Sequence, residues 1–375
     1  MLSILSGLYS RLYTSIYASK YGLYIFLIII LYPIYPIAYP ILLLYVLYRY
    51  FSRRQSTFWH RQPIHSDTFG LIKSPDNIVV NDIQLAPDES WTEPNNESLM
   101  TFLTQHYERD LQITPAYLDY QHYLIIGIKK VDQLIATIGA TMTTFKIGDD
   151  VRKGFYVDLL CIDRQYRKGG YAVKMMEKLI EKWKALGSEI MLFKLDNMQI
   201  APWKPNFTFQ YYLLDKSTIS VPSQSKRYRL EQVNETNLLN AYNYFTSQMK
   251  KYDIVEEMTL DRFKQWTTKS EITVSYLVKR KTQIVGFVNL MRNKYKYQDN
   301  IVDVMDVVYC LGNKLVIMPL LLSMKTQYYI FLDIMDHKDI IALYQMKPLY
   351  ITNYYFYNYE LLNRYNCMDV GINRF

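Results

Sequence analysis

The feature that most constrains the fold is an order of predicted elements that occurs twice along the chain. The first copy comprises a helix at 97–109, strands at 123–129, 134–146 and 154–162, a helix at 171–186 and a strand at 189–194. The second comprises helices at 235–250 and 259–266, strands at 272–279, 283–291 and 301–309, a helix at 315–324 and a strand at 328–334. These assignments follow apolar spacing. The 375 residues allow two domains or one large duplicated fold, so we expect an α/β (mixed α+β) architecture built by duplication.

Changes in composition divide the chain into four predicted parts. A tail at 1–20 precedes an apolar segment at 21–50, and from Ser56 onward the composition is that of a globular protein. The two repeated units occupy 51–225 and 226–375, because the linker-like stretch SVPSQSK separates them.

The segment from Tyr21 to Tyr48 contains no charged residue and is long enough to cross a bilayer. Its three prolines would kink a helix or split it into a hairpin. Arginines follow the segment, so we expect the chain from Phe51 onward to face the cytosol, at a viral or host-cell membrane. A cleaved signal peptide is disfavoured because the apolar run is too long and lacks a small-residue cleavage site. A buried core helix is the other alternative.

The net charge limits the kinds of partner, and the cysteine count indicates the redox compartment. The net charge of +8 favours anionic partners but does not choose among phosphates, nucleic acid and acidic membranes. The three cysteines are widely spaced, which indicates a reducing compartment and no disulfide framework. Neither they nor the five histidines form a metal-binding pattern, so we predict no metal.

A basic, glycine-containing turn, QYRKGGYA at 165–172, follows the strand at 154–162 and opens a helix. Backbone N–H groups at a helix start favour anions, and glycines let the backbone approach them closely. Arg167 and Lys168 add positive charge. The turn lacks the residues of a Walker loop and the three glycines of a dinucleotide fingerprint. Taken alone, it is either a helix-capping turn or a phosphate cradle.

The spacing Arg167-x-x-Gly170-x-Ala172 after a strand resembles the acetyl-CoA loop of the GNAT acyltransferase superfamily. Further segments narrow the resemblance to the N-myristoyltransferases over residues 57–375. They are, in the family's order, FWHRQPI at 58–64, LLCI at 159–162 with the loop at 167–172, YYFYNY at 354–359 and VGINRF at 370–375. The resemblance implies two fused GNAT-like halves that share a saddle-shaped mixed sheet, the first for acyl-CoA and the second for a peptide.

The resemblance also implies a binding site for myristoyl-CoA as the acyl donor. Thr57, Phe58 and Trp59 match residues that hold the CoA end. The residues that match the loop around the phosphates are Arg167, Lys168, Gly169, Gly170, Tyr171 and Ala172. The strand that precedes this loop contributes Leu159, Leu160, Cys161 and Ile162.

The implied reaction is attack on the thioester by the amine of a protein's N-terminal glycine. The backbone N–H groups of Leu159 and Leu160 would form an oxyanion hole. The base would be the α-carboxylate of Phe375, which needs a position within hydrogen-bond reach of the amine. The implied partners are proteins with an N-terminal glycine and, through residues 21–50, a membrane. We expect a monomer and no nucleic acid.

The sequence also departs from the family pattern. Gly169 and Gly170 stand where the family has Lys-Arg, and Val173 replaces a proline. A family histidine is missing after Tyr211-Tyr212, and 350–353 replaces a Gly-Asp-Gly. The resemblance assigns both of these last changes to peptide binding.

Three functions therefore stand side by side. They are a membrane-anchored protein N-acyltransferase, a non-catalytic scaffold of the same fold that binds acyl-CoA or a partner, and a general GNAT acetyltransferase. Structural roles are alternatives for single residues. Trp59 suits a core, the tyrosines at 354–359 suit strand packing, and Cys161 suits a buried, unreactive position. Asp158 is either a support for the oxyanion hole or a solvated strand end.

Overall fold

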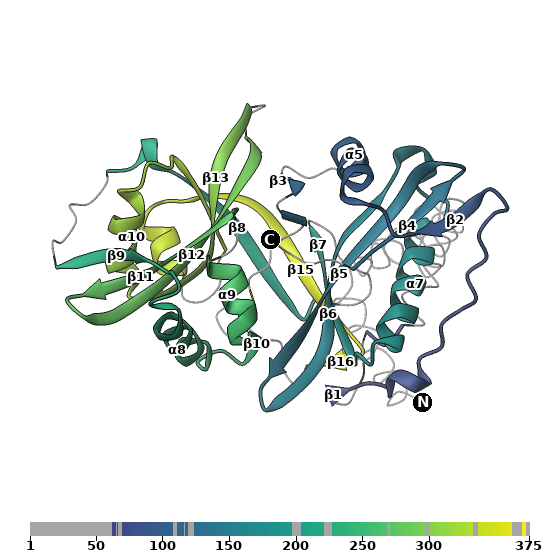
Figure 1. The fold of residues 1–375 in the computed structure, drawn as a ribbon, viewed down its shortest axis with the longest axis horizontal. Helices are drawn as coiled ribbons and strands as arrows, with labels where there is room; N and C mark the ends of the chain where they lie inside the picture. Colours follow the sequence, from purple (N-terminus) through teal and green to yellow (C-terminus); the bar gives the residue numbers. More distant parts are fainter. Residues whose placement is uncertain are drawn as a thin grey trace, which may run out of the picture. The chain divides into compact units, whose positions relative to one another are not determined.

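The computed structural model divides the chain into two units, Met1–Arg61 and Gln62–Phe375, and every described residue belongs to the second (Figure 1). The described residues are 62–64, 66, 70–107, 111–115, 117–118, 124–196, 204–220, 227–268, 271–297, 300–332, 337–361 and 370–372. The predicted membrane segment at 21–50 lies outside them, as do Thr57, Phe58, Trp59 and Phe375. Within the described ranges, no helix is both long and apolar enough to cross a bilayer.

The first copy of the repeat has the predicted order of elements. Two short elements precede it, β1 (Gly70–Leu71) and β2 (Glu89–Thr92). Its own elements are α5 (Asn96–His106), β4 (Leu124–Lys130), β5 (Gln133–Ile147), β6 (Asp150–Ile162), α7 (Tyr171–Ala185), β7 (Ile190–Asp196) and β8 (Phe207–Asp215). The helix predicted at 97–109 ends earlier, at His106, and the strand predicted from 154 begins earlier, at Asp150. β2 and β8 have no counterpart in the prediction.

The second copy also keeps its predicted order. It comprises β9 (Tyr228–Gln232), α8 (Leu238–Met249), β10 (Ile254–Glu257), α9 (Leu260–Thr268), β11 (Thr273–Arg280), β12 (Gln283–Tyr297), β13 (Asn300–Gly312), α10 (Lys314–Leu322) and β14 (Tyr328–Leu332). It ends with α11 (Lys338–Leu343), β15 (Lys347–Tyr357), β16 (Tyr359–Glu360) and β17 (Val370–Gly371). The short strand β3 (Leu111–Gln112) pairs with β12.

Corresponding turns of the two copies have the same backbone. The hairpins β4–β5 and β11–β12 turn at Val131 and Lys281, whose φ angles are 56° and 55°. α7 ends as the sequence predicts, because Gly187 takes the left-handed conformation, with φ of 65°, that terminates helices. The equal turn geometry supports the interpretation that the two copies are repeats.

One 15-stranded mixed sheet contains strands of both copies (Figure 1). Its order is β17-β10-β5-β6-β7-β15-β8-β14-β13-β12-β11-β9, with β2, β3 and β4 paired off this path. The copies exchange strands, because β15 lies between β7 and β8, and β8 pairs with β14. The prediction of a large mixed sheet is therefore confirmed. The predicted domain boundary falls at 225/226, in a stretch outside the described residues, and stays a prediction.

Helices cover the sheet through apolar side chains. α7 packs against β4, β5 and β6 and buries Met175, Leu179 and Trp183. The indole Nε1 of Trp183 donates to the carbonyl oxygen of Ile190 at 3.0 Å, which ties the helix to the start of β7. In the second copy, α8 and α9 belong to one apolar cluster and α10 and α11 to another.

The late tyrosine motif packs inside the sheet. The side chains of Tyr354, Tyr355, Tyr357 and Tyr359 have no exposed surface. Asn358 has a φ of 65°, and its amide Nδ2 donates to the carbonyl oxygens of Lys73 and Glu189, both at 2.9 Å. The interpretation of these tyrosines as strand packing is confirmed, and Asn358 holds the segment around Lys73 against the core.

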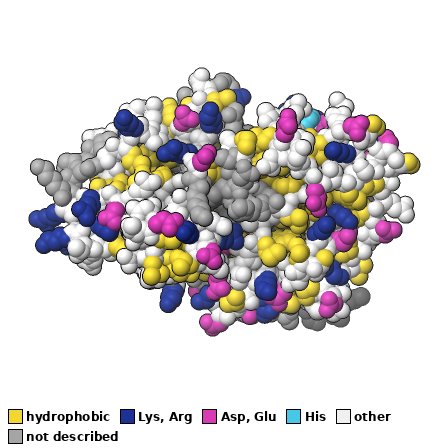
Figure 2. Space-filling view, viewed as in Figure 1, with side chains coloured by type: hydrophobic (Ala, Val, Ile, Leu, Met, Phe, Trp, Pro, Cys, Tyr) yellow, Lys and Arg dark blue, Asp and Glu magenta, His cyan; other side chains and the backbone are white. Residues whose placement is uncertain are grey.

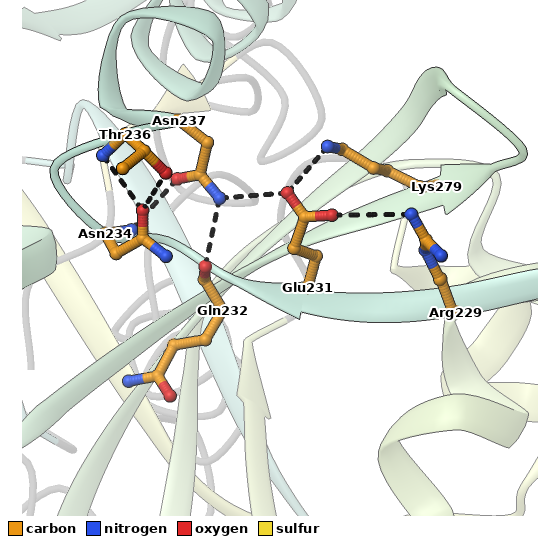
Figure 3. Close-up of polar contacts among 7 residues, drawn as sticks. All are labelled: Arg229, Glu231, Gln232, Asn234, Thr236, Asn237 and Lys279. Carbon is orange, nitrogen blue, oxygen red and sulfur yellow. Dashed lines mark hydrogen bonds and ion pairs between the residues drawn. The ribbon is translucent and has the colours of Figure 1, made fainter.

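A polar network holds the edge strand β9 to the start of α8 (Figure 3). The Glu231 carboxylate accepts from Lys279 Nζ at 2.6 Å and from Asn237 Nδ2 at 3.0 Å. The hydrogen bond from Lys279 is the main cause that holds the pKa of Glu231 below its ordinary value. Asn237 Oδ1 accepts from the backbone N–H of Asn234 at 2.9 Å, which closes the turn before the helix.

Candidate active site

Strand β6 carries a bulge where the sequence predicts an oxyanion hole. In its register with β5, Thr137 faces Cys161 and Gly139 faces Asp158, so Leu159 and Leu160 together face Ile138. Leu159 has a left-handed φ of 54° and a buried side chain, whereas 40% of Leu160 is exposed. Such an extra residue bends a strand and takes backbone groups out of the ladder.

A glycine on the neighbouring strand makes room for this bulge. A Cβ at Gly139 would lie 3.0 Å from Ile125 Cδ1 and 3.2 Å from Leu159 Cδ1. Both distances are shorter than ordinary contacts, so a larger residue would push against Leu159.

The ladder between β6 and β7 ends directly before the bulge. The two strands pair in parallel from Gly154–Ile190 to Val157–Phe193. From Asp158 onward β6 continues along β5, while β7 continues along β15. The segment Asp158–Ile162 thus has a strand neighbour on its β5 side, and its other side faces the place where two strands part.

The basic turn after β6 adopts a left-handed conformation twice. A short 3-10 helix, η2 (Arg164–Tyr166), starts on the side chain of Asp163, whose Oδ1 accepts from the N–H of Gln165 at 2.9 Å. Lys168 and Gly170 have φ angles of 69° and 80°. The four residues 167–170 are exposed, so the charges and the glycines predicted for the phosphates lie at the surface.

Arg167 links the turn to both flanking elements. Its Nε donates to the carbonyl oxygen of Ile162 and its Nη2 to that of His106, both at 3.2 Å. Arg167 therefore fixes the turn between the end of β6 and the end of α5, and Lys168 beside it is exposed.

The start of α7 has the properties of an anion site. Gly170 occupies the N-cap position without a side-chain hydrogen bond to the helix. The first N–H groups of a helix have no partner within it, so an uncapped start leaves donors and the positive end of the helix dipole for a ligand. No heavy atom lies within 4 Å of the place where a Cβ of Gly170 would stand. The turn opens the helix without a capping side chain, and phosphate binding there stays a prediction.

The side chain of Tyr171 points to a structural partner. Its hydroxyl donates to Glu89 Oε1 on β2, and Lys174 Nζ lies 3.2 Å from Glu89 Oε2. The hydrogen bond to Glu89, followed by burial, raises the pKa of Tyr171 to about 12. Tyr171 can therefore serve an anion through its backbone, as can the half-buried Ala172 beside it.

A polar cluster lies beside the bulge, and the sequence does not predict that its residues meet. Asp158 Oδ1 accepts from the backbone N–H of Leu159 at 2.8 Å and from the hydroxyl of Tyr107 at 3.3 Å. Lys194 Nζ lies 3.5 Å from Asp158 Oδ2 and 5.6 Å from the ring centre of Tyr156. The signal in the sequence was one lysine inside the apolar run IMLFKLD and one aspartate inside YVDLLCI.

The cluster bears on the predicted roles of Leu159 and Asp158. The N–H of Leu159 already has an acceptor in this structure, so it serves a thioester oxygen only after the Asp158 carboxylate moves. Asp158 is buried, which excludes the alternative of a solvated strand end. Cys161 is buried as predicted, with 4% of its surface exposed.

The last described strand runs toward this region. β17 is parallel to β10, and β10 is antiparallel to β5, so β17 heads toward the Gly139 end of β5. Ile372 is fully buried, and the hydroxyl of Tyr309 donates to the carbonyl oxygen of Gly371 at 3.4 Å.

The structure thus brings Leu159–Ile162 and Arg167–Ala172 together on one strand–turn–helix unit. The predicted roles of Thr57, Phe58, Trp59 and Phe375 stay predictions, since those residues lie outside the described ranges. Across the part of the chain that is described, no three metal-ligating side chains gather into a site.

Comparisons with known proteins agree with this unit. Residues 85–201, which run from before β2 to beyond β7, match the model of the acetyltransferase (GNAT) family. No curated protein sequence matches the chain significantly.

Solved structures of one enzyme share the fold. A crystal structure of Saccharomyces cerevisiae N-myristoyltransferase with bound myristoyl-CoA has a TM-score of 0.74 and 13% identity, covering 86% of this chain and 99% of that one. Another, with bound myristoyl-CoA and inhibitors, has a TM-score of 0.72 at 13% identity, covering 85% and 96%. At this identity the likeness concerns the fold. Residues 85–201 thus match the acetyltransferase (GNAT) family, and the chain as a whole shares the fold of N-myristoyltransferase.

Proposed function

We propose that this protein transfers a long-chain acyl group, of the myristoyl class, from acyl-CoA to the amine of an N-terminal glycine. The observation that carries the proposal is the uncapped, basic start of α7, which directly follows a bulged strand that has parted from its neighbour. The yeast enzyme with the same fold was crystallised with myristoyl-CoA.

The first step is binding of the CoA phosphates at the turn. The N–H groups of Tyr171 and Ala172, at the start of α7, and the ammonium of Lys168 supply donors and positive charge. Gly170 allows close approach, because the space beside its Cα is open. Thr57, Phe58 and Trp59 are proposed to hold the rest of the CoA end.

The second step is acyl transfer beside the bulge. The substrate amine attacks the thioester carbonyl carbon, a C–N bond forms, and the C–S bond breaks. The amine loses a proton to the α-carboxylate of Phe375, and the departing CoA thiolate takes up a proton. The direction of β17, which heads for the Gly139 end of β5, supports this role for the end of the sequence. The N–H of Leu160 stabilises the oxyanion, and that of Leu159 can join it only if the Asp158 carboxylate releases it.

The proposal keeps the membrane anchor at residues 21–50 and a cytosolic catalytic part. On the face drawn in Figure 2, the described Lys and Arg side chains are interspersed with Asp and Glu. A mixed surface of this kind suits a protein substrate better than a long nucleic acid. Extraction of membranes with alkaline carbonate tests the anchor, since a spanning segment keeps the full chain in the pellet.

Calorimetry of the full chain in detergent with myristoyl-CoA tests the binding step. We expect binding of myristoyl-CoA to be tighter than that of acetyl-CoA or free CoA, since a long chain adds about 0.8 kcal/mol for each buried methylene. Absence of any acyl-CoA binding contradicts the enzyme reading. Preference for acetyl-CoA supports the general acetyltransferase instead.

Turnover with a glycine-initiated peptide then separates an enzyme from a scaffold. An alanine-initiated peptide is the control, and a two-residue C-terminal extension is the matched variant. We expect the extension to remove turnover while CoA binding persists. The scaffold remains the second candidate, because the N–H of Leu159 is bonded to Asp158. Tight acyl-CoA binding without turnover supports it.

A further inference from the structure

The buried cluster of Tyr107, Asp158 and Lys194, here termed the Asp158 cluster, has no part in the proposed reaction. Asp158 is 6% exposed and Lys194 is 8% exposed, so both charged groups are more than nine-tenths buried. Taking a carboxylate and an ammonium out of water is costly, and an apolar pair of similar volume often stabilises a fold equally well. Such a pair therefore calls for an explanation beyond stability.

The cluster stands at a particular place in the sheet. Val157 and Phe193 are the last paired residues of β6 and β7, and Asp158 and Lys194 directly follow them. Their ion pair, with 3.5 Å between Nζ and Oδ2, joins the two strands where their hydrogen bonds stop. Lys194 is also held by its other neighbour, since it faces Tyr354 of β15 in register.

The cluster is bonded to the strained residue of the bulge. Leu159 adopts a left-handed backbone, which a leucine rarely takes and which costs free energy. The Asp158 carboxylate accepts the N–H of that residue at 2.8 Å, and the hydroxyl of Thr137 donates to its carbonyl oxygen at 3.2 Å. Both backbone polar groups of Leu159 thus have side-chain partners.

The second copy of the repeat shows that a bulge does not require this arrangement. β13 has an extra residue, Val308, between the pairs Asn289–Tyr309 and Leu290–Val307. Val308 does not have a positive φ, and the residue before it is Val307, an apolar side chain. The left-handed backbone is therefore a feature of the bulge that carries the candidate active site.

We propose that the Asp158 cluster positions the Leu159–Leu160 bulge so that the N–H of Leu160 meets the thioester oxygen of the bound acyl-CoA. Asp158 acts as a positioning residue through the N–H of Leu159, and Lys194 and Tyr107 keep its carboxylate in place. The inference rests on the proposed function, because it assigns a support to the same acyl-transfer site.

The proposal is tested by separating the acceptor oxygen of residue 158 from its charge. Asp158→Ala removes both, whereas the double variant Asp158→Asn with Lys194→Met keeps an acceptor and removes both charges. Myristoyl-CoA labelled with ¹³C at the carbonyl reports polarisation, because its stretching band shifts to lower frequency when donors meet the oxygen. Asp306→Asn, on β13 of the second copy, is the matched control. Thermal unfolding confirms that each variant folds.

For Asp158→Ala we expect loss of the band shift and a kcat about 100-fold lower, the usual effect of losing an oxyanion donor. Its Kd for myristoyl-CoA should stay within about threefold, since the phosphate contacts remain. The double variant should keep the band shift and a kcat within about tenfold of wild type. If Asp158→Ala does not fold, the double variant carries the test by itself.

Two results overturn the inference. One is a double variant with the band unshifted and turnover lost, which shows that residue 158 acts through its charge, as a proton acceptor does. The other is an Asp158→Ala protein that keeps both the shift and the turnover. Failure of the proposed function looks different, because then the wild-type chain binds no acyl-CoA.

Discussion

This protein has two strand–turn–helix units, β6–α7 and β13–α10, with the same construction. The start of the helix is open in the first unit and closed by protein atoms in the second. Each strand has one extra residue near its end, and each pairs with a following parallel strand over a few residues before the two part. After β6, seven residues at 163–169 intervene before Gly170, which opens α7 without a side-chain cap. After β13, Gly312 leads directly to Asn313, whose side chain caps the N–H of Leu315 at 3.0 Å.

The glycines show the same contrast. Gly170 faces open space, whereas a Cβ at Gly312 would lie 2.4 Å from the carbonyl oxygen of Val285 and 2.9 Å from Tyr244 Oη. Protein atoms thus crowd Gly312, the residue before the N-cap of α10, whereas the space beside Gly170, the N-cap of α7, is open. The comparison teaches that two copies of one scaffold can differ in the free space at the start of a helix, which is where we propose that the CoA phosphates bind.

The largest expected effect is on Gly312, where the two turns differ most in free space. Gly312→Ala should lower the free energy of unfolding by about 4 kcal/mol or more, since it adds a clash with backbone to a φ of 107°. Gly170→Ala, which adds strain without a clash, should lower it by about 1 kcal/mol. Denaturant titration of both variants measures the difference, and equal losses would contradict the contrast.

The next effect concerns the residues at which the parallel strands stop pairing, Val157 in the first copy and Asp306 in the second. Burial raises the pKa of Asp306 from 3.8 to about 7, although Asn293 donates a hydrogen bond to it. Between these two pH values the folded state holds a proton that the unfolded chain has lost, so stability falls as the pH rises through this window.

Asp306→Asn has no such proton. We expect the variant to gain on the order of 3 kcal/mol over wild type at pH 8 and almost nothing at pH 4. Urea titration at the two pH values measures the gain. A gain that does not depend on pH would show that Asp306 is not the group that titrates.

A third effect tests the charge of the open turn. Lys168→Gln should weaken binding of myristoyl-CoA by about three- to tenfold, and the loss should shrink at high salt because the turn is exposed. Lys314→Gln, at the first position of α10, is the matched control and should leave affinity unchanged. Calorimetry at two ionic strengths measures both. An effect of equal size in the control would mean that only net charge matters.

The smallest effect concerns the caps themselves. Asn313→Ala should cost about 1 kcal/mol of stability, since it removes the side-chain cap of α10. Gly170→Asn should leave stability within about 0.5 kcal/mol, because asparagine tolerates the left-handed conformation. Its side chain offers a cap to α7, so acyl-CoA affinity should fall. If Gly170→Asn binds acyl-CoA as tightly as wild type, the N–H groups of α7 are not the anion site.

Much of the fold follows from local patterns in the sequence. The spacing of Val173, Met176, Leu179, Ile180 and Trp183 predicts α7. The last four side chains are buried, whereas Val173 is 40% exposed. Gly187 predicts its end. The repeated order of strands and helices is also correct, since periodicity and turn residues act over a few neighbours.

The pairings between distant strands could not be predicted in the same way. β15 inserts between β7 and β8 of the first copy, although more than 130 residues separate it from either strand in the sequence. Nothing within 347–357 specifies these partners. The Asp158 cluster could not be predicted for the same reason, since Tyr107, Asp158 and Lys194 lie far apart in the sequence. Lys194 in an apolar strand indicates that an acidic partner exists, but the sequence does not show which residue it is.

The exchange of strands has a consequence for the order in which the protein is made. β7, the strand that carries Lys194, has β15 as its antiparallel neighbour, and β15 begins at Lys347, near the end of the chain. A nascent chain on the ribosome therefore carries a complete glycine turn long before the sheet beneath it can close. A product that stops before Lys347 holds every residue of the first copy, yet it leaves the edge of β7 open to pairing with other chains. We therefore expect the candidate site to assemble only after β15 has been synthesised.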